Sequence, residues 1–170
     1  MNVGGHRLTN EELRAHFATL EFADVATFRA SGNVVFAAAE HTPRAAQAHI
    51  EQGLRELLGY EVPTFVRSDA EVRAIAAHRP FAEERVQSSA GKLQVSLLAS
   101  APSAAARELV LGLASAQDAL AFGERELYWL PSGGVLDSEL DLKAIDAALG
   151  ASTMRTKATV ELIAAKHCGG

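Results

Sequence analysis

The chain has 170 residues, 48% of them hydrophobic and 22% charged, which suffices to bury the core of one domain or of two small ones. A formal net charge of −5 argues against a protein that coats nucleic acid or an anionic membrane through bulk charge. It has no run of about 18 apolar residues and no signal peptide, and its lone cysteine, Cys168, excludes an internal disulfide, so we expect a cytoplasmic protein.

The first part of the chain contains signals for two helices and three strands. Thr9 and Glu12 have capping-box spacing at the start of a helix, and Gly59 is placed to end another. Gly32 and Asn33 form a pair suited to a tight hairpin turn between two strands. The expected elements are a helix at residues 10–20, strands at 24–30 and 33–38, a helix at 43–58 and a strand at 61–67.

The second part of the chain contains more elements. Leu93, Val95 and Leu97 alternate with more polar residues, as in a strand buried on one face. An irregular polar stretch that ends at Gly91 precedes them. The expected elements are helices at residues 68–77, 103–113, 138–149 and 157–166, strands at 92–99, 118–122 and 126–130, and an extended segment at 151–155.

The order of elements predicts an α+β protein with two ferredoxin-like halves. The second half runs strand, helix, strand, strand, helix, strand, and the first half has the same order without its opening strand. We place the first half at residues 1–78, a linker at 79–91, and the second half, with an extra C-terminal helix, at 92–170. Loss of the opening strand would leave two strands without a ladder partner. We therefore expect that the natural chain begins upstream of Met1, or that a strand from a second copy fills the gap in a homodimer.

Three stretches of the chain resemble motifs of one bacterial protein family. They are NVGGHRLTNEELR at the start, FRASGNVVF in the first hairpin and TMRTKATVELIAA at the end. With these motifs in this order, essentially the whole chain is similar to the domain-of-unknown-function family 1697, a family of uncharacterised bacterial proteins. The resemblance implies two ferredoxin-like halves, and it implies no activity, because the activity of the family is unknown.

The resemblance to the family motifs is incomplete. The family has a full strand before its N-V-G-G and a glutamine before its S-G-N, where this chain has Met1 and Ala30. The family's tail tryptophan lies in a segment that is Thr156-Lys157-Ala158 here, so a role of that tryptophan is in doubt. The matching residues are Asn2, Gly4, Gly5, Ser31, Gly32, Asn33, Val34, Phe36, Thr153, Arg155, Thr159 and Val160.

Common motifs of catalysis, metal binding and RNA binding are absent. Ser132 lacks the preceding glycine of a nucleophile elbow, and Gly91-Lys92 lacks the earlier glycine of a phosphate loop. The histidines are scattered, the carboxylates do not have EF-hand spacing, and the aromatic residues do not follow an RNA-recognition motif. We expect neither a metal nor a cofactor.

Glycines and an arginine near the start of the chain suit anion binding. Gly4 and Gly5 can bring backbone amides close to an anion, although a plain strand-to-helix turn needs the same glycines. Arg29 ends a strand beside Ser31, a placement that suits either a bidentate anion contact or an ordinary surface ion pair.

The tail has a second basic site. Arg155 and Lys157 place two cations at the amino end of the last helix, where free amides favour an anion; alternatively, Arg155 pairs with Asp137 or Asp141. We predict a protein that binds a small anionic or phosphorylated ligand between its halves. The alternatives are an enzyme of unknown reaction with its site in the same cleft, and an oligomerising interaction module. The predicted ligand-binding residues are Asn2, Gly4, Gly5, Arg29, Ser31, Asn33 and Arg155.

Overall fold

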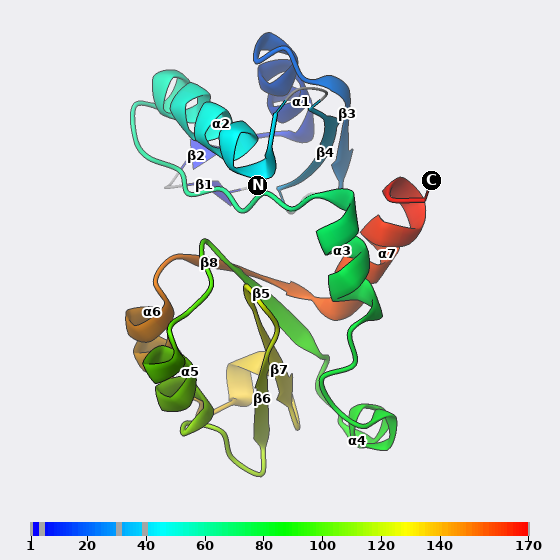
Figure 1. The fold of residues 1–170 in the computed structure, drawn as a ribbon, viewed down its shortest axis with the longest axis vertical. Coiled ribbons are helices and arrows are strands. Elements are labelled where there is room, and N and C mark those ends of the chain that lie inside the picture. Colours follow the sequence, from blue (N-terminus) through cyan, green and yellow to red (C-terminus); the bar gives the residue numbers. More distant parts are fainter. Residues whose placement is uncertain (1, 4–5, 30–31, 39–40, 170) are drawn as a thin grey trace. The chain divides into compact units, whose positions relative to one another are not determined.

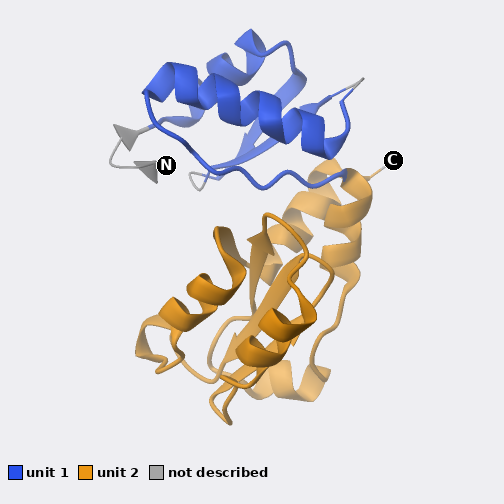
Figure 2. Ribbon diagram, turned by 60° about the vertical axis from the view of Figure 1, so that its left-hand side comes forward, with its two compact units in different colours: residues 1–68 blue, residues 69–170 orange. Residues whose placement is uncertain are grey.

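A computed structural model describes residues 2–3, 6–29, 32–38 and 41–169, with the backbone alone for residues 2, 3, 6 and 7 (Figure 1). The chain forms two compact units, Met1–Ser68 and Asp69–Gly170 (Figure 2). The division therefore falls before the helix that begins at Asp69, whereas we expected it after His78. Among the described residues, no helix is both long and apolar enough to cross a membrane.

The first unit contains two helices and two small antiparallel sheets. Its buried core is made of Phe17, Phe22, Ala46, Ile50 and Leu54, which come from both helices and the segment after the first. The elements are β1 (Asn2–Val3), β2 (His6–Arg7), α1 (Asn10–Thr19), β3 (Ala23–Phe28), β4 (Asn33–Ala37) and α2 (Pro43–Leu58). Strand β1 pairs with β2, and β3 pairs with β4. The unit is therefore α+β, as predicted.

The helix boundaries follow from the capping residues. The Thr9 amide donates to the Glu12 carboxylate at 2.7 Å, and the Glu12 amide donates to the Thr9 hydroxyl at 3.1 Å, so the predicted capping box begins α1. Helix α2 has Pro43 in its first turn, and it ends at Gly59, whose φ of +81° is left-handed. Both helices are confirmed.

The first hairpin differs from the predicted turn. Phe28 pairs with Asn33, so the loop runs from Arg29 to Gly32, and Asn33 is the first residue of β4. Arg29 and Gly32 have φ values of +58° and +73°. The prediction of a tight turn at Gly32-Asn33 was wrong. Asn33 is already paired in the ladder, and the left-handed residues of the loop are Arg29 and Gly32.

The strand expected at residues 61–67 is absent from the described structure, where this segment has no regular secondary structure. Val62 and Val66 still pack against the core of the first unit. The Thr64 amide donates to the Glu51 carboxylate at 2.8 Å, which satisfies a group that a ladder would otherwise pair. A strand needs a neighbouring strand, and none of the described strands pairs with this segment.

The second unit contains a four-stranded antiparallel sheet in the order β6-β7-β5-β8. Its strands are β5 (Gln94–Leu98), β6 (Asp118–Phe122), β7 (Glu126–Pro131) and β8 (Ser152–Thr156). Its helices are α3 (Asp69–Ala77), α4 (Glu83–Ser88), α5 (Ala104–Leu111), α6 (Leu142–Leu149) and α7 (Lys157–His167), with a short 3-10 helix at Val135–Asp137. The predicted helices and strands of this part are confirmed, although α6 begins later than expected because Asp141 caps it.

Helices cover both faces of this sheet. On one face, Val110 of α5 and Ile145 of α6 pack with Leu127 and Trp129 of β7. On the other face, Ile75 of α3 and Val160 of α7 pack with Val95 and Tyr128. The two faces are distinct because successive side chains of a strand point in opposite directions. Tyr128 and Trp129 thus belong to different cores.

The segment expected to be a linker, residues 79–91, belongs to the second unit and contains α4. The Ser89 hydroxyl donates to the Pro131 carbonyl at 2.6 Å. A Cβ atom at Gly91 would lie 2.2 Å from the same carbonyl oxygen, so only glycine fits against this loop. Helix α3 is also tied to this unit, because the Lys157 ammonium donates to the Ala76 carbonyl at 2.8 Å.

Candidate functional site

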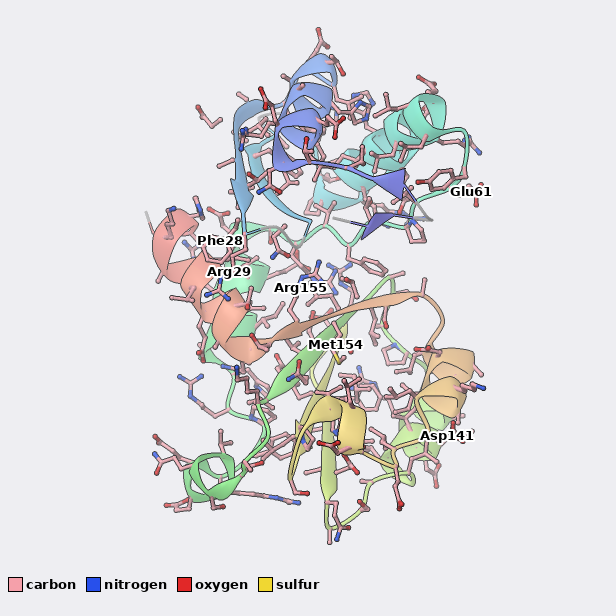
Figure 3. The ribbon with its side chains drawn as sticks, turned by 180° about the vertical axis from the view of Figure 1, so that it is seen from behind. Phe28, Arg29, Glu61, Asp141, Met154 and Arg155 are labelled. Carbon is pink, nitrogen blue, oxygen red and sulfur yellow. The ribbon has the colours of Figure 1, made fainter. Side chains whose placement is uncertain are left out.

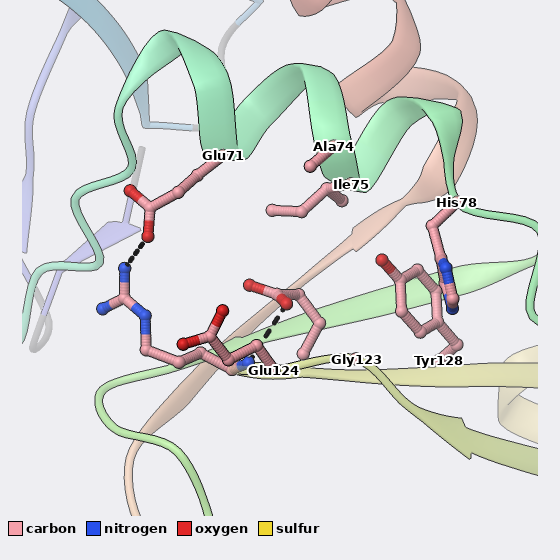
Figure 4. Close-up of a pocket in the computed structure, with 9 residues that line it drawn as sticks. Glu71, Ala74, Ile75, His78, Gly123, Glu124 and Tyr128 are labelled. Atoms are coloured by element: carbon pink, nitrogen blue, oxygen red, sulfur yellow. Dashed lines mark hydrogen bonds and ion pairs between the residues drawn. The ribbon is translucent and has the colours of Figure 1, made fainter.

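A pocket lies in the second unit between α3 and the turn that joins β6 to β7 (Figure 4). Its volume is about 160 Å³. It opens on the sheet face that α3 and α7 cover, because Tyr128 belongs to that core. The lining residues are Glu71, Ala74 and Ile75 of α3, His78 just after it, and Gly123, Glu124, Arg125, Glu126 and Tyr128.

One face of α3 forms the first wall. Glu71, Ala74, Ile75 and His78 have the spacing that places side chains on the same side of a helix. Ile75 is 4% exposed and provides an apolar surface. Glu71 forms an ion pair with Arg125 of the opposite wall, so this contact joins the two walls at one end of the pocket (Figure 4).

The β6–β7 turn forms the second wall, and Arg107 of α5 holds it. The Arg107 guanidinium donates to the Gly123 carbonyl at 2.9 Å and to the Glu124 carbonyl at 2.7 Å. It also lies 5.0 Å from the centre of the Phe122 ring. Two carbonyls bound by one planar group have little freedom to move, so the turn is preorganised.

Gly123 makes room for the carboxylate of Glu126. The residue Glu126 is 7% exposed, and its carboxylate accepts a hydrogen bond from the Arg125 amide at 3.1 Å. A Cβ atom at Gly123 would lie 2.9 Å from the nearer Glu126 oxygen and 3.3 Å from the Tyr128 ring. The glycine therefore permits a buried carboxylate next to a buried tyrosine.

Tyr128 forms the aromatic end of the pocket with His78. The ring centres are 4.9 Å apart, and the rings are inclined by 42°. Tyr128 is 1% exposed, and its hydroxyl points into the pocket (Figure 4). Burial, and then the charge of Glu126, raises the pKa of Tyr128 to about 12, so the hydroxyl keeps its proton at neutral pH. Within the described part of the chain, this hydroxyl makes no hydrogen bond.

The pocket is negatively charged. Its walls carry the carboxylates of Glu71, Glu124 and Glu126 and the single guanidinium of Arg125. Among the described lining residues, three carboxylates therefore stand against one guanidinium. Such surroundings favour groups that donate hydrogen bonds or carry positive charge, and they disfavour anions.

Arg29 and Asn33, two of the residues predicted from the sequence to bind a ligand, lie around the first hairpin. Arg29 is exposed and lies next to Phe28, with its guanidinium 5.5 Å from the ring centre (Figure 3). The Asn10 side chain donates to the Arg29 carbonyl at 3.1 Å, and the Asn33 side chain donates to the Phe28 carbonyl at 3.4 Å. These amides stabilise the loop.

Three of the other predicted residues, Gly4, Gly5 and Ser31, lie outside the described residues. Asn2 is described by its backbone alone, which pairs with Arg7 in the β1–β2 sheet. The predicted anion contacts of these four residues stay predictions.

Arg155 is half-buried on β8, where it pairs with Val95 of β5 (Figure 3). Its guanidinium donates at 2.8 Å to the Thr153 hydroxyl and at 2.8 Å to the Met154 carbonyl. Burial lowers the pKa of this guanidinium. The cation therefore occupies a partly desolvated position, as an anion contact would require.

Lys157 does not provide the second cation that we expected beside Arg155. Its residue is 3% exposed, and its ammonium donates to the Ala76 carbonyl and, at 2.7 Å, to the Glu161 carboxylate. The Thr156 hydroxyl accepts from the Thr159 amide at 3.3 Å and so caps α7. The amino end of α7 thus uses its own side chains, and Lys157 serves to hold α3 against α7.

The pocket residues were not recognised as a site from the sequence. In the sequence alone, Glu71 and Glu124 look like ordinary surface residues, and Tyr128 was interpreted as a core residue. One signal was available, because Glu126 and Tyr128 alternate on one face of an otherwise apolar strand. A buried acid at such a position indicates a special role.

Comparison with known proteins places the chain in a family. The family model described as "Protein of unknown function (DUF1697)" matches residues 1–128. The chain belongs to the DUF1697 family. The matched residues include all nine that line the pocket. No curated protein matches this DUF1697 protein.

A solved structure shares the fold. The conserved bacterial protein SP0830 from Streptococcus pneumoniae superposes with a TM-score of 0.63 and is 18% identical in sequence. The match covers 97% of this chain and 92% of the other. At this identity the likeness shows the fold alone.

Proposed function

We propose that this DUF1697-family protein binds a small polar molecule in the pocket between α3 and the β6–β7 turn. The observation that carries the proposal is the hydroxyl of the buried residue Tyr128, which points into the pocket and makes no hydrogen bond to the described residues (Figure 4). Buried polar groups in native proteins are nearly always hydrogen-bonded, to protein, water or ligand. A ligand that accepts from Tyr128 would supply the missing contact.

Binding fits the lining residues better than catalysis does. None of the described lining residues is a serine, threonine or cysteine that could act as a nucleophile beside His78. The wall that holds Glu124 and Glu126 is fixed from behind by Arg107, as a preformed binding site requires.

The fold is consistent with this use of the second unit. We infer that the unit is a ferredoxin-like domain, because the element order from β5 to β8 and the strand order β6-β7-β5-β8 fit a split βαβ arrangement. Its second sheet face would be open in that arrangement, and here α3 and α7 cover it. For the first unit, a ferredoxin-like origin rests on the order of its elements alone. Fold alone assigns no ligand.

A screen with a blocked pocket tests the proposal. Small amines, polyols and carboxylates would be added to the whole protein, and the melting temperature would be measured for wild type, Ala74→Trp and Ala77→Trp. Ala74 lines the pocket and Ala77, on the same helix, is exposed outside it. A compound that binds the folded state should raise the melting temperature of wild type and Ala77→Trp but not of Ala74→Trp. If no compound does so, the proposal is wrong.

A small anionic ligand is the second candidate function, and the partly buried guanidinium of Arg155 favours it. On this reading the ligand contacts are those predicted from the sequence: Asn2, Gly4, Gly5, Arg29, Ser31, Asn33 and Arg155. Inorganic phosphate and sugar phosphates should then raise the melting temperature of wild type and of Arg85→Gln, but not of Arg155→Gln. Equal shifts in all three proteins would exclude Arg155 from the contact.

A further inference from the structure

We infer that His41 and His49 form a binding site for a divalent transition-metal ion of the Zn²⁺, Ni²⁺ and Cu²⁺ group. The site lies in the first unit, so it is independent of the pocket in the second unit and goes beyond the proposed function. The observation that leads to it is a pair of imidazole rings whose centres lie 5.9 Å apart and whose planes differ by 11°.

The fold of the first unit brings these two histidines together. His41 lies just before α2, and its amide donates to the Ala38 carbonyl at 2.9 Å. His49 lies within α2 and presents its ring to the same place. The ring of Phe22, which is buried, has its centre 6.0 Å from that of His41 and 5.7 Å from that of His49. Phe22 therefore anchors both imidazoles beside the core.

A hydrogen bond determines which nitrogen of His49 can bind a metal. Its Nε2 lies 3.2 Å from the Leu20 carbonyl oxygen. A carbonyl oxygen only accepts hydrogen bonds, so Nε2 carries the hydrogen, and the lone pair of the neutral ring is at Nδ1. Histidines that bind metals almost always donate their other ring N–H to a carbonyl or carboxylate in this way. The structure therefore presents Nδ1 of His49 as a metal ligand.

The remaining ring nitrogens are available. Within the part of the chain that the structure describes, neither Nδ1 of His49 nor a ring nitrogen of His41 makes a hydrogen bond. His41 is exposed, so an ion can reach it and its ring can turn toward the ion. A metal bound at about 2.0–2.1 Å to one nitrogen of each ring places the ring centres roughly 4.5–6.5 Å apart. The observed separation of 5.9 Å falls within this range.

The ligand type selects the metal. Imidazole nitrogen suits zinc, copper and nickel, whereas magnesium and calcium prefer oxygen ligands. Among the described residues, no group of three or more histidine, cysteine, aspartate or glutamate side chains could hold a metal ion. The pair therefore supplies two ligands, and water supplies the others. The two histidines do not have the i, i+4 spacing of helical metal motifs, so the sequence alone does not reveal them as a pair.

Titration with metal ions tests the inference. The whole protein, without an affinity tag, would be titrated with Zn²⁺ and with Mg²⁺ by calorimetry at about pH 7, and the ring nitrogens would be followed by NMR. We expect one Zn²⁺ per chain and no binding of Mg²⁺. Zn²⁺ should shift Nδ1 of His49, while Nε2 keeps its hydrogen. The affinity should fall at about pH 5, because protons compete with the metal for the imidazoles.

Variants assign the ligands. His41→Gln and His49→Gln should each weaken Zn²⁺ binding by about tenfold or more. His6→Gln changes another histidine of the first unit and should leave the affinity unchanged. Because His41 is exposed, its replacement keeps the test valid even if His49→Gln fails to fold. Zn²⁺ should also raise the melting temperature of wild type and His6→Gln more than that of His41→Gln.

A purely aromatic contact between the two rings predicts different results. The inference is overturned if Zn²⁺ does not bind, if it binds wild type and His41→Gln equally, or if Mg²⁺ binds as tightly. It is also overturned if the metal shifts Nε2 of His49 in place of Nδ1. None of these results bears on the pocket of the second unit, whose separate test is the screen with Ala74→Trp.

Discussion

Replacing Tyr128 by phenylalanine should not lower the stability of the ligand-free protein, although Tyr128 is one of its most buried residues. The change removes only the hydroxyl and keeps the ring contact with His78. A buried hydroxyl without a partner costs about 1–3 kcal/mol relative to a satisfied one. Because this hydroxyl borders a pocket that water can enter, it avoids most of this cost. We expect the free energy of unfolding to stay unchanged or to rise by up to about 1 kcal/mol.

The single tryptophan makes this measurement specific. Trp129 is 3% exposed and lies in the core of the second unit, so its fluorescence reports the unfolding of that unit. Urea denaturation followed at Trp129 would compare wild type with Tyr128→Phe, and a gain of about 1 kcal/mol corresponds to a rise in melting temperature of about 4 °C for a unit of this size. Tyr60→Phe, which changes the other tyrosine and lies in the first unit, should leave this transition in place.

The opposite result would refute the reasoning. If Tyr128→Phe lowered the free energy of unfolding by more than about 1 kcal/mol, the hydroxyl would be making a stabilising hydrogen bond in the free protein. The pocket would then contain a satisfied core tyrosine, and the argument for a ligand would lose the observation on which it depends.

Three further changes test the structure around the site and the first unit. Gly91→Ala should destabilise the second unit by about 1–3 kcal/mol in urea denaturation followed at Trp129, because its Cβ would meet backbone oxygens at 2.2 and 2.4 Å. Gly133→Ala should not destabilise it, because no atom lies within 4 Å of the Cβ position there. Arg107→Leu should speed hydrogen exchange at the β6–β7 turn and weaken binding in the pocket, because two carbonyls lose their donor. Burial lowers the pKa of His16, so the unfolded chain takes up the proton more readily, and the first unit should lose stability as the pH falls through about 6.5. His16→Leu should reduce this loss in circular dichroism melts at pH 5–8, and an unchanged pH dependence would contradict the assignment.

Local signals in the sequence predicted most of the secondary structure. Capping residues such as Thr9, and alternation such as Val95 with Leu97, act over a few residues, and the elements that depend on them are confirmed. The segment at 61–67 has the residue types of a strand but no strand beside it, and residue type alone does not reveal that difference.

Tertiary contacts account for what sequence reasoning missed. Helix α3 joins the second unit with the help of Lys157, 81 residues away along the chain, whose ammonium donates to the Ala76 carbonyl near the end of the helix. The pocket brings Glu71 next to Arg125 across 54 residues of the chain. No periodicity within either segment indicates such pairings, so both the division of the chain and the candidate site had to come from the structure.

The two helices that cover the second face of the sheet come from opposite ends of the second unit, α3 from its beginning and α7 from its end. A recombinant fragment that began at Lys92 would keep the whole four-stranded sheet and α7 but lose α3, whose Ile75 shares a core with Val95 and Tyr128, side chains that are almost fully buried in the intact unit. Anyone who wishes to study this half in isolation should therefore start the fragment at Asp69.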